Sequence, residues 1–205
     1  MISALLLAAG AARRFGAPKL LEDLHGKPVI RWSASVAIGP PVDELVVVVP
    51  PNASSLRAAL DGIDARFVVN PRPELGLASS IACGAAALDR SSDAVLVLLG
   101  DEPATSRTAV EQVVAHFEAS TASIVVPTYE GVRGHPVLFA RSVIPELREF
   151  TGGDVGARAL VDRVPSRVAF VELGMSLPPD IDTPGDLARL REQPQYISPP
   201  STQRP

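Results

Sequence analysis

Four short apolar runs mark the first half of the chain, at residues 2–7, 45–49, 66–69 and 94–99. They are rich in Val, Leu and Ile, and their apolar residues are continuous instead of alternating with polar ones. Strands of a parallel sheet show this pattern when helices cover both faces of the sheet, because side chains on both faces are then buried. The runs therefore predict buried parallel strands.

Segments with helical character separate these runs, at residues 29–37, 54–60 and 77–88. Strands that alternate with helices indicate βαβ crossovers. The pattern continues with a helix at residues 108–119 and a fifth strand at residues 123–126. We therefore expect an α/β fold with a doubly wound, Rossmann-like, mostly parallel sheet.

The rhythm changes in the second half of the chain. Residues 128–139 contain two glycines and predict a small β excursion or hairpin. The following elements are expected to be two helices, a strand and a last helix, at residues 142–150, 156–163, 168–173 and 184–191. Composition is uniform over residues 1–192, which predicts one domain, and the Pro- and Ser-rich tail at 193–205 has little to bury and is expected to be mobile.

Composition and charge exclude several classes of protein. The 205 residues are 46% apolar and 20% charged, which suits one α/β domain with a full core. A formal charge of -4 argues against broad nucleic-acid binding, which relies on Lys and Arg. No stretch approaches the roughly 20 apolar residues that span a bilayer. Cys83 is the only cysteine, so no intrachain disulfide can form. We expect a cytoplasmic protein that binds neither nucleic acid nor membrane.

Polar residues follow the ends of the predicted strands. Gly10 follows the first strand, Asn70 the third, Asp101 the fourth, and Asp180 and Asp182 the last. Open parallel sheets bind their ligands outside the carboxyl ends of the strands. The sequence therefore predicts one site at this edge of the sheet.

The segment after the first strand has the chemistry of a phosphate-binding loop. Its small residues let the backbone approach a ligand closely, and Arg14 and Lys19 can neutralise a triphosphate. It is neither a Walker A loop nor a dinucleotide fingerprint, because the Lys-Ser/Thr pair and the G-x-G-x-x-G spacing are both missing. The alternative interpretation is a plain strand-to-helix connection with a solvated basic face.

The order Leu7-Ala8-Ala9-Gly10, then Arg14-Phe15-Gly16 and Lys19, resembles the signature of the molybdenum cofactor nucleotidyltransferase family. The resemblance covers residues 5–187 and implies a Rossmann-like nucleotidyltransferase. It implies that the nucleotide is bound by several of these residues, namely Leu7, Ala8, Ala9, Gly10, Arg14 and Lys19. The chain is most similar to the cytidylyltransferase branch, because the guanylyl branch has glycine in place of Ala9. CTP is therefore the expected nucleotide, with GTP as the alternative, and molybdopterin the expected acceptor.

Two acidic motifs could hold a magnesium ion. Asp101, in Gly-Asp-Glu-Pro, follows a strongly apolar strand, and a carboxylate fixed there suits a hard cation such as Mg²⁺. The resemblance implies that Asp101 is the metal-binding aspartate, whereas a turn or helix cap is the structural alternative. Asp180 and Asp182 alternate on extended chain, so one of them should face the site. The resemblance favours Asp182, and capping of the last helix is its alternative.

Further residues are candidates for nucleotide or acceptor contacts. Asn70 and Ser79 offer amide and hydroxyl groups to a base or ribose, although Ser79 would also serve as a helix cap. Beyond them, His135, Asp154 and Arg158 lie in segments where the family resemblance places the acceptor. A structural histidine and an Asp154–Arg158 pair are the alternatives.

These residues suggest a nucleotidyl transfer without a general base. A phosphate acceptor has a second pKa near 6, so it is already an anionic nucleophile at neutral pH. Positioning, Mg²⁺ and cationic groups would then carry the reaction, with Arg14, Lys19 and Asp101 as the catalytic residues. Alternatives are guanylyl transfer, transfer to a sugar phosphate or another organic phosphate, and a non-catalytic partner of a molybdenum enzyme.

Overall fold

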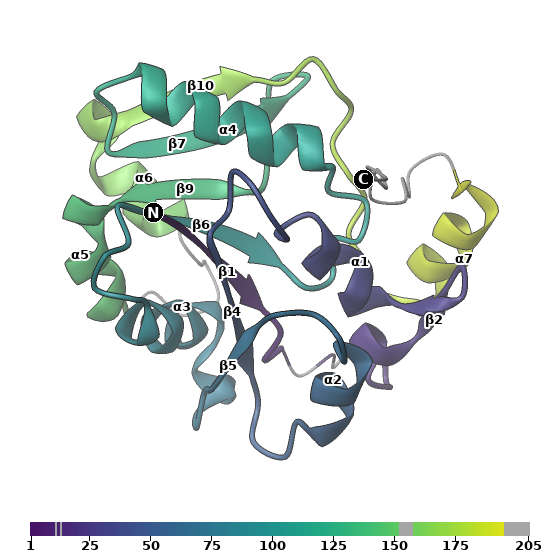
Figure 1. Cartoon of the computed structure of the whole chain (residues 1–205). Helices are drawn as coiled ribbons and strands as arrows, with labels where there is room; N and C mark the ends of the chain where they lie inside the picture. The colour runs from purple at the N-terminus through teal and green to yellow at the C-terminus, as the bar shows by residue number, and fades with distance from the viewer. Residues whose placement is uncertain (11, 13, 152–157, 195–205) are drawn as a thin grey trace, which may run out of the picture.

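A central sheet organises the described part of the chain (Figure 1). The computed structural model describes residues 1–10, 12, 14–151 and 158–194. The strands of the sheet are β1 (Ile2–Leu7), β4 (Glu44–Val49), β5 (Arg66–Val69), β6 (Ala94–Leu99), β7 (Ile124–Tyr129), β8 (Val132–Arg133), β9 (Val137–Ala140) and β10 (Val168–Glu172). Their order is β10-β7-β9-β6-β1-β4-β5, and β8 pairs with β7.

The middle of the sheet is parallel. β1 lies between β4 and β6 and runs parallel to both, with Leu5 opposite Val46 on one side and Val97 on the other. Every residue of β1 is buried, since helices cover both faces of the sheet. β5 is parallel to β4, and β10 is parallel to β7. The predicted α/β class with a doubly wound, mostly parallel sheet is confirmed.

One strand runs against this direction in the interior of the sheet. β9 begins inside the segment that the sequence predicts as an excursion, and it lies antiparallel between β6 and β7. Within residues 128–139, all of which are described, the hairpin is limited to the short pairing of β8 with β7. Because β9 is antiparallel, its first residue lies at the edge where β6 ends. His135, just before β9, is thereby brought to the carboxyl edge of the parallel strands.

Helices cover the sheet in two layers. They are α1 (Val29–Ser35), α2 (Ser54–Ala59), α3 (Leu77–Ala87), α4 (Arg107–Ala119), α5 (Ile144–Arg148), α6 (Arg158–Arg163) and α7 (Pro184–Glu192). α1, α2, α4 and α7 pack on the face that carries Leu6, and α3, α5 and α6 pack on the face that carries Leu5. Because side chains alternate between the two faces along each strand, they pack into two apolar cores, one on each face of the sheet.

The remaining elements of the described chain are short strands and 3₁₀ turns. They are β2 (Asp23–Leu24), β3 (Lys27–Pro28) and the 3₁₀ turns η1 (Lys19–Leu21), η2 (Pro73–Leu75), η3 (Arg141–Val143) and η5 (Pro165–Arg167). β2 and β3 form a separate antiparallel pair, and α7 lies beside β2 (Figure 1). The longest described helix, α4, has 13 residues, and none of the helices in the described ranges could cross a membrane.

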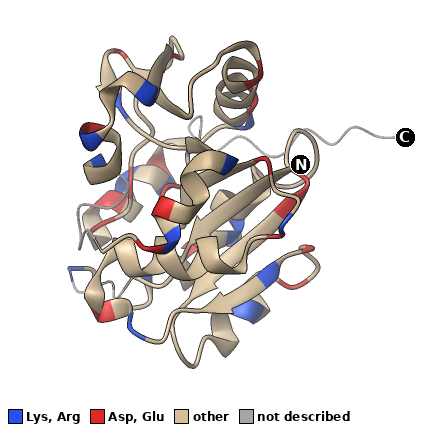
Figure 2. Cartoon of the chain, turned by 90° about the vertical axis from the view of Figure 1, so that its left-hand side faces the viewer, with Lys and Arg blue, Asp and Glu red and all other residues tan. Residues whose placement is uncertain are grey.

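Charged residues lie mostly outside the sheet. Figure 2 shows blue and red segments interspersed on loops and helices, with largely tan strands. Acidic and basic groups are therefore mixed on this side of the molecule. The tail from residue 195 onward, predicted to be mobile, lies outside the described residues.

Candidate active site

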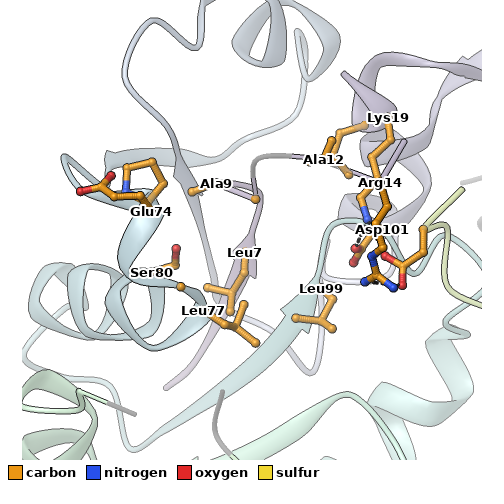
Figure 3. Close-up of a pocket in the computed structure, with 15 residues that line it drawn as sticks. Leu7, Ala9, Ala12, Arg14, Lys19, Glu74, Leu77, Ser80, Leu99 and Asp101 are labelled. Atoms are coloured by element: carbon orange, nitrogen blue, oxygen red, sulfur yellow. Dashed lines mark hydrogen bonds and ion pairs between the residues drawn. The ribbon is translucent and has the colours of Figure 1, made fainter. Parts of the chain in front are cut away.

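A cavity of about 440 Å³ opens at the carboxyl ends of β1 and β6 (Figure 3). Its lining includes most of the residues expected to bind the nucleotide, together with neighbours from η2 and α3: Leu7, Ala9, Gly10, Ala12, Arg14, Lys19, Leu20, Pro73, Glu74, Gly76, Leu77, Ser80, Leu99, Asp101 and Asp182. Figure 3 shows Arg14, Lys19 and Asp101 gathered on one wall, opposite Glu74 and Ser80. The cationic and acidic candidates are thus brought together in one place.

The loop after β1 is shaped by its small residues. The amide of Ala8 donates to the carbonyl of Val48 at 2.8 Å, which extends the pairing of β1 with β4 by one residue. Beyond it, the amides of Phe15 and Gly16 donate to the carbonyl of Ala12, at 3.0 and 3.1 Å, and close a turn. Gly16 has φ +77°, a conformation that costs glycine little. This turn carries the chain from Gly10 back to η1.

Ala8 differs from its neighbours in the loop. It lines a separate cavity of about 470 Å³, formed with Gly16–Leu21, Pro50 and Leu56, and not the cavity of Figure 3. The two cavities share Gly10, Ala12, Lys19 and Leu20. Since successive residues of an extended chain face opposite sides, Leu7 and Ala9 face the first cavity while Ala8 faces away from it.

Lys19 is the centre of a charged cluster. Its Nζ lies 2.6 Å from Oδ2 of Asp101 and 3.2 Å from Oδ1 of Asp182. Only 8% of Lys19 is exposed, whereas both aspartate side chains are more than a quarter exposed. Burial alone would lower the pKa of Lys19, but the two carboxylates outweigh it and raise the pKa. Lys19 is therefore a protonated cation that reaches the cavity from a buried stem.

Arg14 completes the cluster from the solvent side. Its Nη2 lies 2.8 Å from Oδ2 of Asp182, and 74% of its side chain is exposed. An ion pair with so exposed a partner is weak, because water screens it. Arg14 is therefore only weakly held by Asp182.

Backbone contacts hold Asp101 and Asp182 at the cavity. The amide of Ile181 donates to the carbonyl of Asp101 at 2.9 Å, which ties the last loop to the end of β6. The cap of α7 is Thr183, whose hydroxyl accepts from the amide of Asp186 while Asp186 accepts from the amide of Thr183. Asp182 is therefore not the helix cap, and its carboxylate remains available to the cavity.

A second cavity of about 480 Å³ adjoins the first. It shares Leu77 and Leu99 with the first cavity. Its full lining consists of Leu77, Leu99, Glu102, Val126, Arg133, Gly134, His135, Val137, Arg158, Val161, Leu177, Pro178 and Asp180. Two of the three residues expected to bind the acceptor, His135 and Arg158, therefore lie in one cavity beside the charged cluster. The third, Asp154, lies outside the described residues.

The pKa values of Asp180 and His135, which both line the second cavity, are raised. Burial raises the pKa of Asp180, and the negative charges of Asp182 and Asp101 add to the effect. His135 Nδ1 lies 3.0 Å from Oε1 of Glu102. Burial alone would lower the pKa of His135, but the hydrogen bond and charge of Glu102 outweigh it and raise that pKa.

Asn70 and Ser79 line neither cavity. Asn70 is fully buried, and its amide donates to the hydroxyls of Ser79 and Ser80 at 2.8 and 3.0 Å. The amide of Arg72 donates to Asn70 Oδ1 at 3.0 Å, and the hydroxyl of Ser79 donates to the carbonyl of Gly76 at 2.8 Å. These bonds hold the loop around η2 against α3. They shape the wall of the first cavity, and the hydroxyl that lines it is that of Ser80.

Sequence reasoning overlooked Glu74, Ser80 and the role of Glu102. Ser80 adjoins Ser79, which the pattern did select, whereas Glu74 lies in η2, between Asn70 and Ser79, and has no signal of its own. Glu102 follows Asp101 directly, but its partner His135 is 33 residues away and lies just before the antiparallel strand β9. No local signal in the chain predicts that pairing.

The donor set of the first cavity suits a hard divalent cation. Asp101 and Asp182 both place an oxygen within 3.2 Å of the Lys19 ammonium, so the two carboxylates converge on a point that favours positive charge. Within the described ranges, no group of three or more His, Cys, Asp and Glu side chains forms a metal cage. Mg²⁺ keeps several waters and is usually held by one or two carboxylates plus substrate phosphates, which fits this pair.

The sequence profile of the MobA-like NTP transferase domain matches residues 4–168. The chain belongs to this family. The match includes β1, the loop after it, Lys19 and Asp101, and therefore most of the first cavity. The chain thus contains a MobA-like NTP transferase domain.

Individual relatives agree with this family. Bifunctional protein GlmU of Pelobacter propionicus is 30% identical over 129 residues, which are 62% of this chain and 28% of GlmU. This MobA-like chain therefore spans less than a third of that relative. The crystal structure of an Rv0371c homolog from Mycobacterium sp. strain JC1 is 27% identical, with a TM-score of 0.85 over 96% of this chain and 98% of that chain. Rv0371c of Mycobacterium tuberculosis H37Rv, solved in complex with manganese, is 26% identical, with a TM-score of 0.75 over 94% and 98%.

Proposed function

We propose that this MobA-like nucleotidyltransferase moves a nucleoside monophosphate, CMP from CTP, onto a phosphate of molybdopterin and releases pyrophosphate. One observation carries the proposal. Lys19, Asp101 and Asp182, far apart in sequence, converge beside two cavities that share the side chains of Leu77 and Leu99. Such a junction suits a reaction between a triphosphate in the first cavity and an acceptor in the second.

The first cavity has the groups that a nucleoside triphosphate needs. Backbone at Ala9 and Gly10 can approach phosphate oxygens, and Arg14 and Lys19 supply positive charge. The family match supports a nucleoside triphosphate as substrate. The preference for CTP rests on Ala9, because the guanylyl branch has glycine at this position and the chain resembles the cytidylyl branch there.

The reaction follows from the charge of the substrates. An oxygen of the acceptor phosphate attacks the α-phosphorus of the nucleotide, a new P–O bond forms, and the bond between the α-phosphorus and its β-bridging oxygen breaks. Pyrophosphate leaves with the electron pair of that bond. Because the acceptor phosphate is already anionic at neutral pH, no side chain has to remove a proton from it.

The chain supplies positioning and positive charge. Lys19 and Arg14 hold the triphosphate and offset the charge that develops on the pyrophosphate. Asp101 and Asp182 would hold Mg²⁺, which supplies a Lewis acid for the phosphate oxygens when it is bound. A divalent cation is supported by the manganese complex of the mycobacterial relative.

The proposal is tested by pyrophosphate release from CTP, GTP, ATP and UTP with Mg²⁺, each with and without molybdopterin. Release with CTP that needs molybdopterin and is lost in Asp101→Ala is the expected result. Release with GTP would move the protein to the guanylyl branch. Release with glucose 1-phosphate in place of molybdopterin would favour a sugar-phosphate acceptor. Absence of release from folded, metal-loaded protein with every pair would contradict the proposal and favour a non-catalytic partner of a molybdenum enzyme.

A further inference from the structure

Glu102 carries an oxygen that the described protein leaves unsatisfied. Its Oε1 pairs with His135 Nδ1 at 3.0 Å, whereas its Oε2 is buried and no donor in the described ranges contacts it. A buried carboxylate oxygen without a hydrogen bond is costly, because it has lost water and gained no partner. Such an atom in a native protein calls for an explanation, and its place in the wall of the second cavity points to a ligand.

His135 holds this carboxylate in one orientation. The imidazole donates to one oxygen from a position just before β9, and the hydroxyl of Tyr129 in turn donates to the carbonyl of His135. The side chain of Glu102 is 13% exposed, so it has little room to turn away. The remaining oxygen is therefore a fixed hydrogen-bond acceptor.

The walls of the second cavity are mostly apolar. Eight of the thirteen lining residues carry no polar side chain: Leu77, Leu99, Val126, Gly134, Val137, Val161, Leu177 and Pro178. A polyol would leave hydroxyls unpaired against such walls, which is unfavourable. A flat ring instead buries its faces against them and presents its polar atoms at the edge.

The two arginines of the second cavity have different surroundings. Arg133 is engaged by Asp162 at 2.7 Å, and its guanidinium lies 4.8 Å from the ring centre of Phe170. Arg158 lies near enough for its charge to oppose protonation of His135. Arg158 therefore adds positive charge for the phosphate of an acceptor.

Resting on the proposed function, we infer that Glu102 is a specificity-determining residue of the acceptor cavity. Its carboxylate, oriented by His135, accepts hydrogen bonds from N–H groups on the edge of a flat, phosphorylated heterocycle. A sugar phosphate lacks both the flat faces and these N–H donors. The cavity should therefore discriminate against it.

The decisive variant is Glu102→Gln. The amide oxygen of Gln can still accept from His135, but an NH₂ group then replaces Oε2 and meets the N–H donors of the ligand. The KM for molybdopterin is expected to rise by at least about tenfold, which corresponds to the loss of one charge-assisted hydrogen bond. The KM for CTP should stay unchanged, because Glu102 does not line the first cavity.

Two further variants control this experiment. Glu102→Met keeps the size of the side chain but removes both oxygens, so it should weaken the binding of molybdopterin to a similar extent. A thermal melt of this variant shows whether it folds. Glu118→Gln, on the exposed surface of α4, makes the same chemical change away from both cavities and should leave all constants unchanged.

The outcomes separate this inference from the proposed function. An unchanged KM for molybdopterin in Glu102→Gln, with transfer intact, would show that Glu102 only positions His135 and would overturn the inference alone. Transfer to glucose 1-phosphate but not to molybdopterin would also overturn it, while nucleotidyl transfer stands. If no pair of substrates reacts, equilibrium binding of molybdopterin decides. Weaker binding to Glu102→Gln supports the inference, and equal or absent binding overturns it.

Discussion

Asp180 and Asp182 are two residues apart, yet they line different cavities. Asp182 lies beside Lys19 in the first cavity, and Asp180 faces the second. The chain here is neither helix nor strand, and the buried Ile181 lies between the two aspartates, whose side chains diverge into different cavities. One short segment thereby contributes a carboxylate to each of the two sites.

This divergence predicts different effects of two matched substitutions. Asp182→Asn should weaken the binding of Mn²⁺ together with CTP by more than about tenfold, since even residues that merely orient a metal ligand contribute that much. Asp180→Asn should leave that affinity unchanged and alter the KM for the acceptor. Titration calorimetry with Mn²⁺ and CTP measures the first quantity, and steady-state kinetics the second. Equal effects of both changes on the metal would contradict the division of roles.

The two lysines of the chain allow a matched test of Lys19. Removal of its ammonium should lower kcat by about 100-fold to 1,000-fold, the loss typical of one group that stabilises transition-state charge. Lys27→Ala is the control, because Lys27 stacks on Trp32, at 4.5 Å from the ring centre, outside both cavities. Circular dichroism should show the same fold in both variants. Wild-type turnover of Lys19→Ala would refute its role.

The pKa of His135 should depend on Glu102. Burial disfavours the charged imidazole, and Glu102 more than compensates through its hydrogen bond and charge, so the pKa lies above its usual value. Glu102→Gln removes the negative charge, and the pKa should therefore fall. NMR titration of the imidazole, assigned with His135→Asn, measures both values. A pKa that does not move would mean that the carboxylate is not charged beside the ring.

Gly84 should tolerate no side chain. A Cβ added at this position of α3 would lie 2.2 Å from Cδ1 of Leu5, which is fully buried in β1. Gly84→Ala gains helix propensity, but overpacking costs about 1–3 kcal/mol and should outweigh that gain of about 1 kcal/mol. Gly185→Ala in α7 is the control, because its Cβ would meet nothing closer than 3.6 Å. Urea unfolding compares the two variants, and a stabilised Gly84→Ala would contradict this packing.

Local patterns in the sequence determined the elements and the edge of the sheet where the site lies. The continuous apolar runs predict β1, β4 and β6, because burial of both faces leaves a signal in neighbouring residues. The run at residues 66–69 also predicts a strand, but β5 lies at the edge of the sheet and none of its residues is buried, so the predicted burial is wrong there. The polar residues at their ends predict the site, because parallel strands end at one edge. Lys19 is a candidate from its chemistry and position, whereas the metal role of Asp101 and the choice of Asp182 over Asp180 came from the family resemblance.

Tertiary structure alone decided which of these residues meet. The insertion of β9 between β6 and β7 depends on long-range pairing, which a four-residue apolar run does not encode locally. That insertion brings His135 to Glu102. Asn70 was selected for its polar group, but complete burial and hydrogen bonds to its neighbours turn that group inward. Periodicity is a property of adjacent residues, whereas partners across the sheet are selected by the packing of the whole core.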